Sequence, residues 1–303
     1  MILARIALAM VLLWAAGSSA APATLTRFPS PEAAVAALVQ AARASDTATL
    51  LGVLGPDARA LVASGDDVAD RQSRERFVRA YDEAHRLAEV GPGVRVLTVG
   101  RDEWPMPIPL VQDAAGWWFD TSRGREEILN RRIGRNELSA VQVCLAYVDA
   151  QREYYVRDPD GDALLQYAQR FRSTPGKRDG LYWDARPDEA PSPLGALVAR
   201  AEAAGYPTKR SSGGRIPYWG YYYRIVKAQG PHAPGGAYDY VVRGNMIGGF
   251  ALVAYPAEYG ASGVMTFIVS HDGIVYQKDL GPGTAAVARA LTLFDPDPSW
   301  SRF

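Results

Sequence analysis

Residues 264–278 read VMTFIVSHDGIVYQK and carry the clearest structural signal in the chain. Two runs rich in β-branched and aromatic side chains flank Asp272 and Gly273, a dipeptide that readily adopts the positive φ angles of a tight hairpin turn. Upstream, residues 221–228 and 250–255 have the same composition and are bounded by glycine or proline. We therefore predict a meander of antiparallel strands in the C-terminal part of the protein.

A long helical pattern precedes these strands. The chain reads as helical from residue 122 to about residue 156, and Gly134 marks a candidate break in it. Apolar residues recur there at helical spacing, at Leu138, Val141, Leu145 and Val148. We expect the sheet to cover this stripe, so that the C-terminal half is a long helix packed on an antiparallel sheet. A short helix is also expected at 194–204.

Helices come first in the N-terminal half. Ser30 is placed to cap a helix that begins with Pro31, and Asp46 is placed to cap a second helix. A later helix is predicted at 73–87. Three strands are then expected, at 94–99, 108–112 and 117–121.

The order of these elements predicts an α+β fold. By analogy, the N-terminal half resembles cone-shaped domains of the nuclear transport factor two-like and cystatin-like type. Because the chain has more residues than a single hydrophobic core usually serves, two domains are expected after a leader at 1–20. We place an N-terminal α+β domain at 21–121 and a C-terminal domain at 122–303.

The N-terminus has the pattern of a secretory signal peptide. Arg5 supplies a positive start, residues 6–16 are apolar, and Ser18 and Ala20 place small side chains where signal peptidase cleaves. The apolar run is shorter than the roughly 18 residues of a membrane anchor. The one cysteine, Cys144, is far from the cleavage site, so no lipid anchor is expected. We predict a periplasmic or secreted protein with no membrane insertion after cleavage.

Charge and cysteine content limit the classes of partner and of covalent bond that we expect for the protein. The chain has 33 basic and 33 acidic residues, and loss of the leader removes one basic residue, Arg5. A nearly neutral protein has no electrostatic footprint for nucleic acid. Cys144 stands at helical spacing from Val141 and Val148, which favours a buried apolar role over a reactive thiol. A single cysteine forms no internal disulfide.

Several longer motifs resemble one known family. These are NELSAVQ at 136–142, DAQREY at 149–154, GKRDGLYW at 176–183, GGFALVAYP at 248–256, VMTF at 264–267 and YQKD at 276–279. The chain resembles a bacterial family known only as domain of unknown function 2950, from Phe28 to about Gly281. The resemblance implies a secreted or periplasmic protein and brings no activity or catalytic residue with it.

The C-terminal half also resembles the globular part of pseudopilins. The shared order is an Asn136-Glu137 helix start, an aromatic strand at 221–223, a strand ending near Pro256, and a final hairpin. A pilin begins with an apolar helix. Here a whole domain precedes the corresponding helix, and that helix is amphipathic. The resemblance therefore implies a pilin-like domain used for envelope contacts rather than for filament assembly.

Residue types used in catalysis are scattered. His85, His232 and His271 are far apart in the sequence, which gives no support for a histidine metal site. Ser270, His271 and Asp272 include the three residue types of a hydrolase triad, but adjacent side chains point in different directions and a triad is assembled across a fold. A hairpin turn is the simpler interpretation of these residues.

One acidic loop has the spacing of metal ligands. Alternate carboxylates at Asp158, Asp160 and Asp162 could converge on calcium. The loop departs from an EF-hand, since Ala163 stands where glycine is required and Gln169 where the bidentate glutamate should be. A polar turn that caps a helix is the alternative, and we expect no cofactor.

Aromatic residues supply the other candidate site. With two neighbouring cations they could stack on sugars or bind an extended peptide. The candidates are Lys177, Arg178, Tyr182, Trp183, Trp219, Tyr221 and Tyr223. The alternative is that they line the sheet and pack beneath a helix.

Three classes of function remain open at this stage. A structural or protein-interaction role in the envelope agrees with export, neutral charge and the pilin-like order of elements. A binding protein for a glycan or peptide agrees with the aromatic residues. A hydrolase would depend on carboxylates that the sequence alone does not pair.

Overall fold

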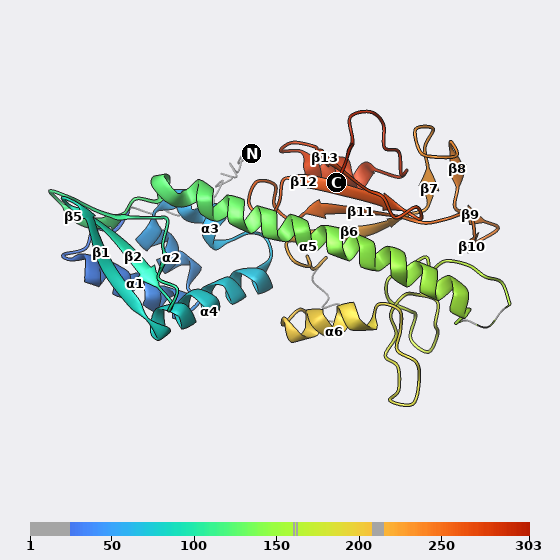
Figure 1. The fold of residues 1–303 in the computed structure, drawn as a ribbon, viewed down its shortest axis with the longest axis horizontal. Helices are drawn as coiled ribbons and strands as arrows, with labels where there is room; N and C mark the ends of the chain where they lie inside the picture. Colours follow the sequence, from blue (N-terminus) through green and yellow to red (C-terminus); the bar gives the residue numbers. More distant parts are fainter. Residues whose placement is uncertain (1–24, 160, 162, 208–214) are drawn as a thin grey trace, which may run out of the picture.

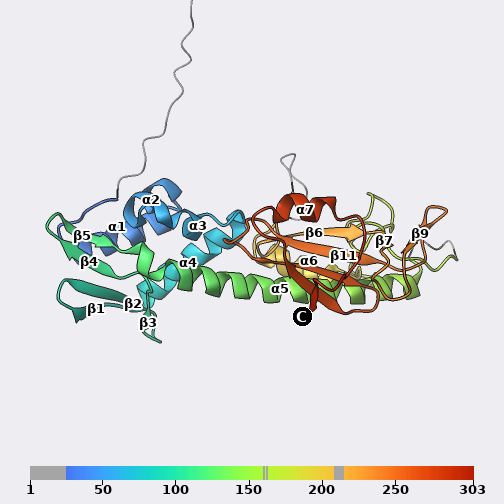
Figure 2. The ribbon, with the colours of Figure 1, turned by 90° about the horizontal axis from the view of Figure 1, so that it is seen from above.

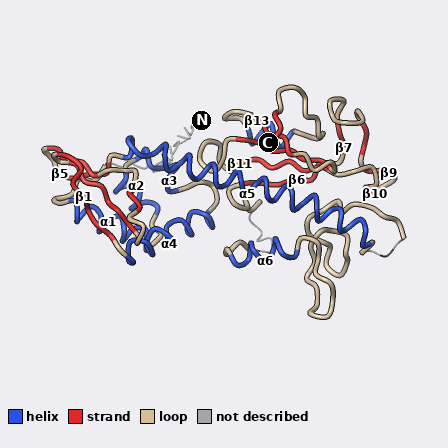
Figure 3. Tube along the Cα trace, in the orientation of Figure 1, coloured by secondary structure: helices blue, strands red, loops and turns tan. Residues whose placement is uncertain are grey.

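The computed structural model describes residues 25–159, 161, 163–207 and 215–303. The predicted leader at 1–20 lies outside these residues. Figure 1 shows two bodies side by side, joined by the helix α5 (Thr121–Arg157), which runs along both of them. Strands gather in two separate places, one in each body (Figure 3). The fold is α+β, as predicted.

Short helices form one layer of the N-terminal body. They are α1 (Pro31–Arg43), α2 (Thr47–Leu54), the 3₁₀ turn η1 (Pro56–Ala58), α3 (Arg59–Val62) and α4 (Asp67–Glu83). The two predicted caps are confirmed. Ser30 Oγ accepts a hydrogen bond from the Ala33 amide at 3.1 Å, and Asp46 Oδ1 accepts one from the Thr49 amide at 3.0 Å. Each cap satisfies a backbone donor that the first helical turn leaves free.

An antiparallel sheet forms the other layer of this body. Its strands are β1 (His85–Gly91), β2 (Val94–Val99), β3 (Trp104–Pro105), β4 (Leu110–Asp113) and β5 (Gly116–Phe119). The order is β1-β2-β4-β5, with β3 paired to β2. The helix predicted at 73–87 is too long at its C-terminal end, because Ala84 is extended and residues from His85 onward pair with β2. This pairing outweighs the weak helical pattern of the segment.

The helix α5 is continuous over 37 residues, so the break expected at Gly134 does not occur. A glycine inside a helix costs only about 1 kcal/mol relative to alanine. Packing on both sides of Gly134 exceeds that cost, since Leu129 contacts the N-terminal core and Ala140 the C-terminal core. The helix ends at Asp158, which has a left-handed conformation.

The C-terminal body is built on a five-stranded antiparallel sheet. Its order is β14-β13-β12-β11-β6, and the strands are β6 (Tyr221–Val226), β11 (Ala251–Pro256), β12 (Met265–Ser270), β13 (Val275–Asp279) and β14 (Ser301–Arg302). The hairpin predicted around Gly273 is confirmed, because β12 pairs with β13 and Gly273 has a φ of 78°. Strand β11, between β12 and β6, is buried along its whole length.

Helices cover both faces of this sheet. Figure 2 shows the sheet between α5 and α7 (Thr284–Ala290), and α7 contacts β11. The short helix α6 (Gly195–Ala203) matches the one predicted at 194–204. Two small two-stranded sheets complete the body: β7 (Ala228–Gln229) with β8 (Tyr238–Asp239), and β9 (Val241–Val242) with β10 (Asn245–Met246).

The buried face of α5 differs from the predicted stripe. Val141 and Val148 are buried, but Leu138 is 57% exposed and Leu145 is 43% exposed. The face against the sheet is instead centred on Ala140, Cys144, Tyr147 and Gln151. Small residues at 140 and 144 let the helix lie close to the sheet, and this close approach leaves the two leucines at its flank. Burial of Cys144 agrees with its predicted apolar role and raises the pKa of its thiol to about 12.

Two hydrophobic cores meet on α5. The N-terminal core includes Ile128 and Leu129 at its margin, and the C-terminal core begins at Ala140. The boundary predicted between residues 121 and 122 lies at the first residue of α5, whereas the two cores divide the helix near its middle. None of the helices in the described part of the chain is both long and apolar enough to cross a membrane.

Candidate functional site

A hollow of about 660 Å³ opens in the N-terminal body between α4, the β2–β3 hairpin and the first half of α5. We call it the arginine hollow, after Arg76, Arg101, Arg131 and Arg135, which line it. Helical spacing explains how two helices supply its walls. On α4, residues 73, 76, 77, 80 and 83 face it, and on α5, residues 128, 131 and 135 do so.

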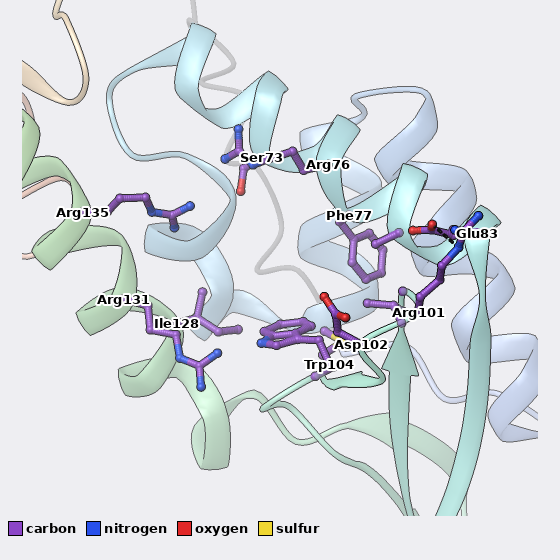
Figure 4. Close-up of a pocket in the computed structure, with 14 residues that line it drawn as sticks. Ser73, Arg76, Phe77, Glu83, Arg101, Asp102, Trp104, Ile128, Arg131 and Arg135 are labelled. Atoms are coloured by element: carbon purple, nitrogen blue, oxygen red, sulfur yellow. Dashed lines mark ion pairs between the residues drawn. The ribbon is translucent and has the colours of Figure 1, made fainter.

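The floor of the arginine hollow is apolar. Phe77, Trp104, Met106 and Ile128 line it, together with Val99. Figure 4 shows Arg131 and Arg135 projecting from α5 toward α4, Arg76 on the opposite wall, and Trp104 between the walls. An apolar surface with a few convergent polar groups is the usual construction of a site for a small molecule.

Positive charge exceeds negative charge around this space. Four arginines line it against two carboxylates, those of Glu83 and Asp102. Arg101 Nε lies 2.7 Å from Glu83 Oε1, so this pair is neutralised locally. Arg131 pairs with Glu127, and its guanidinium also lies 5.8 Å from the centre of the Trp104 ring.

The other two arginines have no such partner. Ser139 Oγ donates to the Arg135 carbonyl at 2.9 Å, but within the described residues the guanidinium groups of Arg76 and Arg135 make no ion pair and no hydrogen bond. Partial loss of hydration lowers the pKa of Arg76, and repulsion from Arg135 and Arg79 lowers it further. A guanidinium stays protonated in proteins, so these residues keep their charge. Glu75 partly offsets the charge of Arg76, and the two walls present a net excess of positive charge across an apolar floor.

Buried polar contacts hold α4 and α5 in place behind the arginines. Asp70 on α4 accepts hydrogen bonds from the Ser64 amide at 2.8 Å and from Ser64 Oγ at 2.7 Å. Burial raises the pKa of Asp70 despite these bonds. Arg132 on α5 donates to the carbonyl oxygens of Ala60, at 2.7 Å, and Leu61. These contacts fix the distance between the two walls.

The arginine hollow continues toward the C-terminal body. A smaller hollow of about 160 Å³ shares Ser73, Arg76 and Arg135 with it and is also lined by Asn136 and Trp219. The same region joins the two bodies, because Asn136 Nδ2 donates to the Ser262 carbonyl at 2.8 Å.

A buried carboxylate makes a second connection between the bodies. Asp66 caps α4 by accepting from the Ala69 amide, and its Oδ2 also accepts from the Gly220 amide at 2.7 Å and the Tyr206 hydroxyl at 2.8 Å. The Tyr206 oxygen in turn accepts from the Trp219 amide at 3.0 Å. Burial, and then the nearby charge of Asp66, raise the pKa of Tyr206. This network places Trp219 at the edge of the smaller hollow.

The aromatic residues predicted from the sequence do not form one site. Tyr221 has no exposed surface and donates to the Met265 carbonyl at 2.9 Å, so its side chain belongs to the core. Tyr223 is partly buried and lines a separate hollow of about 490 Å³ beside β6. The centre of the Trp219 ring lies 5.0 Å from the Arg200 guanidinium. Trp219 lines the hollow of about 160 Å³ that adjoins the arginine hollow.

The remaining members of the predicted set lie on the loop before α6. The Arg172 guanidinium is 4.6 Å from the centre of the Tyr182 ring, and that of Arg178 is 5.6 Å from the Trp183 ring. Lys177 is exposed at the tip of the loop. Tyr182 lines a third hollow, of about 210 Å³. The seven predicted residues are thus divided among the core, a loop and three hollows.

The predicted acidic loop is described only in part. Asp160 and Asp162 lie outside the described residues. Asp158 ends α5 with a φ of 43°, and its Oδ2 accepts from the Ala163 amide at 3.1 Å. Across the described residues, no group of three or more His, Cys, Asp or Glu side chains is arranged to hold a metal ion.

The candidate triad of Ser270, His271 and Asp272 lies in a turn. Ser270 Oγ accepts a hydrogen bond from the Asp272 amide at 3.4 Å. His271 Nε2 lies 3.7 Å from Asp272 Oδ1 and has no bond to the serine oxygen. The hairpin interpretation of these residues is therefore the one that the geometry supports.

None of the residues of the arginine hollow was predicted from the sequence as a site residue. The signal that could have identified them is the spacing of Ile128, Arg131 and Arg135 on one face of α5. On α4, Arg76 supplies a positive charge and Phe77 an aromatic ring on the same side of the helix. The sequence does not show that these two helix faces oppose each other, because that depends on how α5 packs across the sheet.

Comparison with known proteins supports a single relationship. No curated protein and no solved structure matches the chain. A family model matches residues 26–303, which includes all of the described structure except its first residue. The chain therefore belongs to the family described as Protein of unknown function (DUF2950).

Proposed function

We propose that this protein is an exported binding module of the bacterial envelope that captures a small anionic molecule in the arginine hollow. The observation that carries the proposal is the pair Arg76 and Arg135. These guanidinium groups have no described partner and stand on opposite walls above an apolar floor. Export is inferred from the leader pattern around Arg5 and Ala20.

An oxyanion is the chemistry that complements this arrangement. Each guanidinium presents hydrogen-bond donors in a planar fork that matches a carboxylate or phosphate. Two like charges facing each other repel, and an anion between them removes that repulsion. Trp104 and Phe77 then offer apolar surface to the rest of the ligand. The hollow is thus suited to binding an anion with an apolar part.

A docking role for the C-terminal body is a second candidate, and it would be the pilin-like role implied by the sequence resemblance. The observation that favours it is the exposure of Leu138 and Leu145. These leucines are seven residues apart, so they lie on one side of α5 two turns from each other. An exposed apolar row on a helix offers a contact surface to another envelope protein. Ligand capture and docking would use different parts of α5.

Calorimetric titration tests the main proposal. Purified mature protein is titrated with inorganic phosphate, citrate and benzoate, and at least one of them should bind. Arg76→Ala and Arg135→Ala should each weaken that binding about ten- to hundredfold, the effect expected for a hydrogen bond to a charged group. Arg71→Ala is the matched control, because Arg71 is on α4, is exposed and pairs with Glu75. If the two arginine variants bind all three anions as the wild type does, the proposal is wrong.

A further inference from the structure

Another hollow adjoins the arginine hollow and is lined by side chains of the N-terminal core. Its volume is about 140 Å³, and Leu38, Leu50, Leu54 and Leu61 are among the buried side chains that line it. About 15 Å³ of such volume suffices to hold one water molecule, so the space admits several groups of that size. We call it the core hollow.

The two hollows share a wall. Ser73, Phe77, Met106 and Ile128 line both of them. Phe77 and Ile128 are only partly buried, and they stand between the apolar floor of the arginine hollow and the leucines below. Phe77 is therefore one of the side chains at which the two spaces adjoin.

The core hollow offers little to a polar ligand or to water. Its charged groups are on one side and already have partners. Asp70 accepts from Ser64, Arg132 donates to the Ala60 and Leu61 carbonyls, and Arg74 donates to the Val62 carbonyl at 3.2 Å. A largely apolar hollow whose charged groups are already paired takes up apolar groups more readily than polar ones.

We propose that the ligand of this protein is an amphipathic anion, with a carboxylate or phosphate head held by Arg76 and Arg135 and a short hydrocarbon chain that passes Phe77 into the core hollow. This inference rests on the proposed function and specifies its ligand class. The head and the chain are recognised by separate parts of the site. Their contributions can therefore be measured separately.

Affinity should depend on chain length in a defined way. Each methylene that leaves water for an apolar space strengthens binding about fourfold. The gain should continue while the chain fills the core hollow and stop when the hollow is full. A simple anion site, in contrast, gives the same affinity for every chain length.

The experiment uses the full mature protein and a series of straight-chain carboxylates from acetate to decanoate, each below its micelle concentration. The same lengths as alkyl phosphates show which head the arginines prefer. We expect dissociation constants to fall about fourfold per carbon and then level off. Arg76→Ala should weaken every member of the series by a similar factor, because it removes a contact to the head.

A second variant tests the chain contact alone. Ala42 lines the core hollow, so Ala42→Leu partly fills it. This variant should bind acetate as the wild type does and should level off at a shorter chain, with its fold checked by circular dichroism. If it does not fold, Val62→Ile at the same hollow replaces it, with a smaller shift expected because it adds a single methylene.

The outcomes separate the two proposals. Arginine-dependent binding with no effect of chain length overturns the amphipathic ligand and leaves the anion site intact. Chain-dependent binding that is unchanged in Arg76→Ala and Arg135→Ala is non-specific adsorption and also overturns it. Loss of the arginine effect for phosphate, citrate, benzoate and all alkyl carboxylates overturns the anion site itself.

Discussion

The two bodies differ in how α5 packs against them. In the C-terminal body, α5 and α7 cover opposite faces of the sheet, and every residue of β11 is buried. In the N-terminal body, α4 and α5 stand apart over the β2–β3 hairpin and leave a hollow of about 660 Å³. The same helix therefore seals one core and borders an open site in the other. In the function that we propose, the N-terminal body carries the binding surface and the C-terminal body is its scaffold.

The largest expected effect is the cost of removing a leucine from the C-terminal core, compared with a leucine of the N-terminal core. Leu252→Ala in β11 should lower the free energy of unfolding by about 4 kcal/mol, because its side chain is enclosed on all sides. Leu61→Ala should cost only about 2 kcal/mol, since Leu61 already borders the core hollow and loses fewer contacts. Urea denaturation of both variants measures the two values. Equal losses would contradict the difference in packing.

Two glycines allow the packing of α5 to be compared at two points, near its start and near its middle. A Cβ on Gly124 would lie 2.3 Å from the Pro107 carbonyl oxygen, and backbone atoms there have little room to shift. Gly124→Ala should therefore destabilise the protein by about 3 kcal/mol. A Cβ on Gly134 meets nothing within 4 Å, so Gly134→Ala should stabilise it by about 0.5–1 kcal/mol. Thermal melts of the two variants should move in opposite directions.

The smallest effect concerns an exposed contact in the C-terminal body. His232 Nδ1 lies 3.0 Å from Asp295 Oδ2, and this hydrogen bond, followed by the charge of Asp295, raises the pKa of His232. Because the folded pKa is above the unfolded one, the contribution to stability is full at pH values below about 6.5. It is lost as pH rises through the folded pKa.

Melting curves at pH 5.5 and pH 8 measure this contact. The wild type should lose more stability between the two pH values than His232→Gln does. Asp295→Asn is the matched control and should show the same flattened response. A pH response that is identical in all three proteins would show that the contact contributes nothing.

Local features of the fold were predictable because they depend on neighbours in the sequence. Ser30 and Asp46 cap helices through donors three residues away, and Gly273 enables a turn between adjacent strands. Errors arose where distant contacts decide. The segment from His85 pairs with β2 instead of extending α4, and Gly134 stays helical because cores at both ends hold the helix.

The candidate site was less predictable for the same reason. Tyr221 has the residue type of a sugar-binding platform, yet burial under the sheet removes it from any surface. Arg76 and Arg135 look like ordinary solvated residues of amphipathic helices. They gain significance only because α4 and α5, separated in sequence by a whole sheet, come to line the same hollow.

Because α5 is continuous, it fixes the distance between the two bodies. At about 1.5 Å per residue, its 37 residues form a strut about 55 Å long. A ligand held at Arg135 and a partner resting on Leu145 would be separated by a fixed number of helical turns. Load applied to one body would pass along a single rod with no hinge at Gly134.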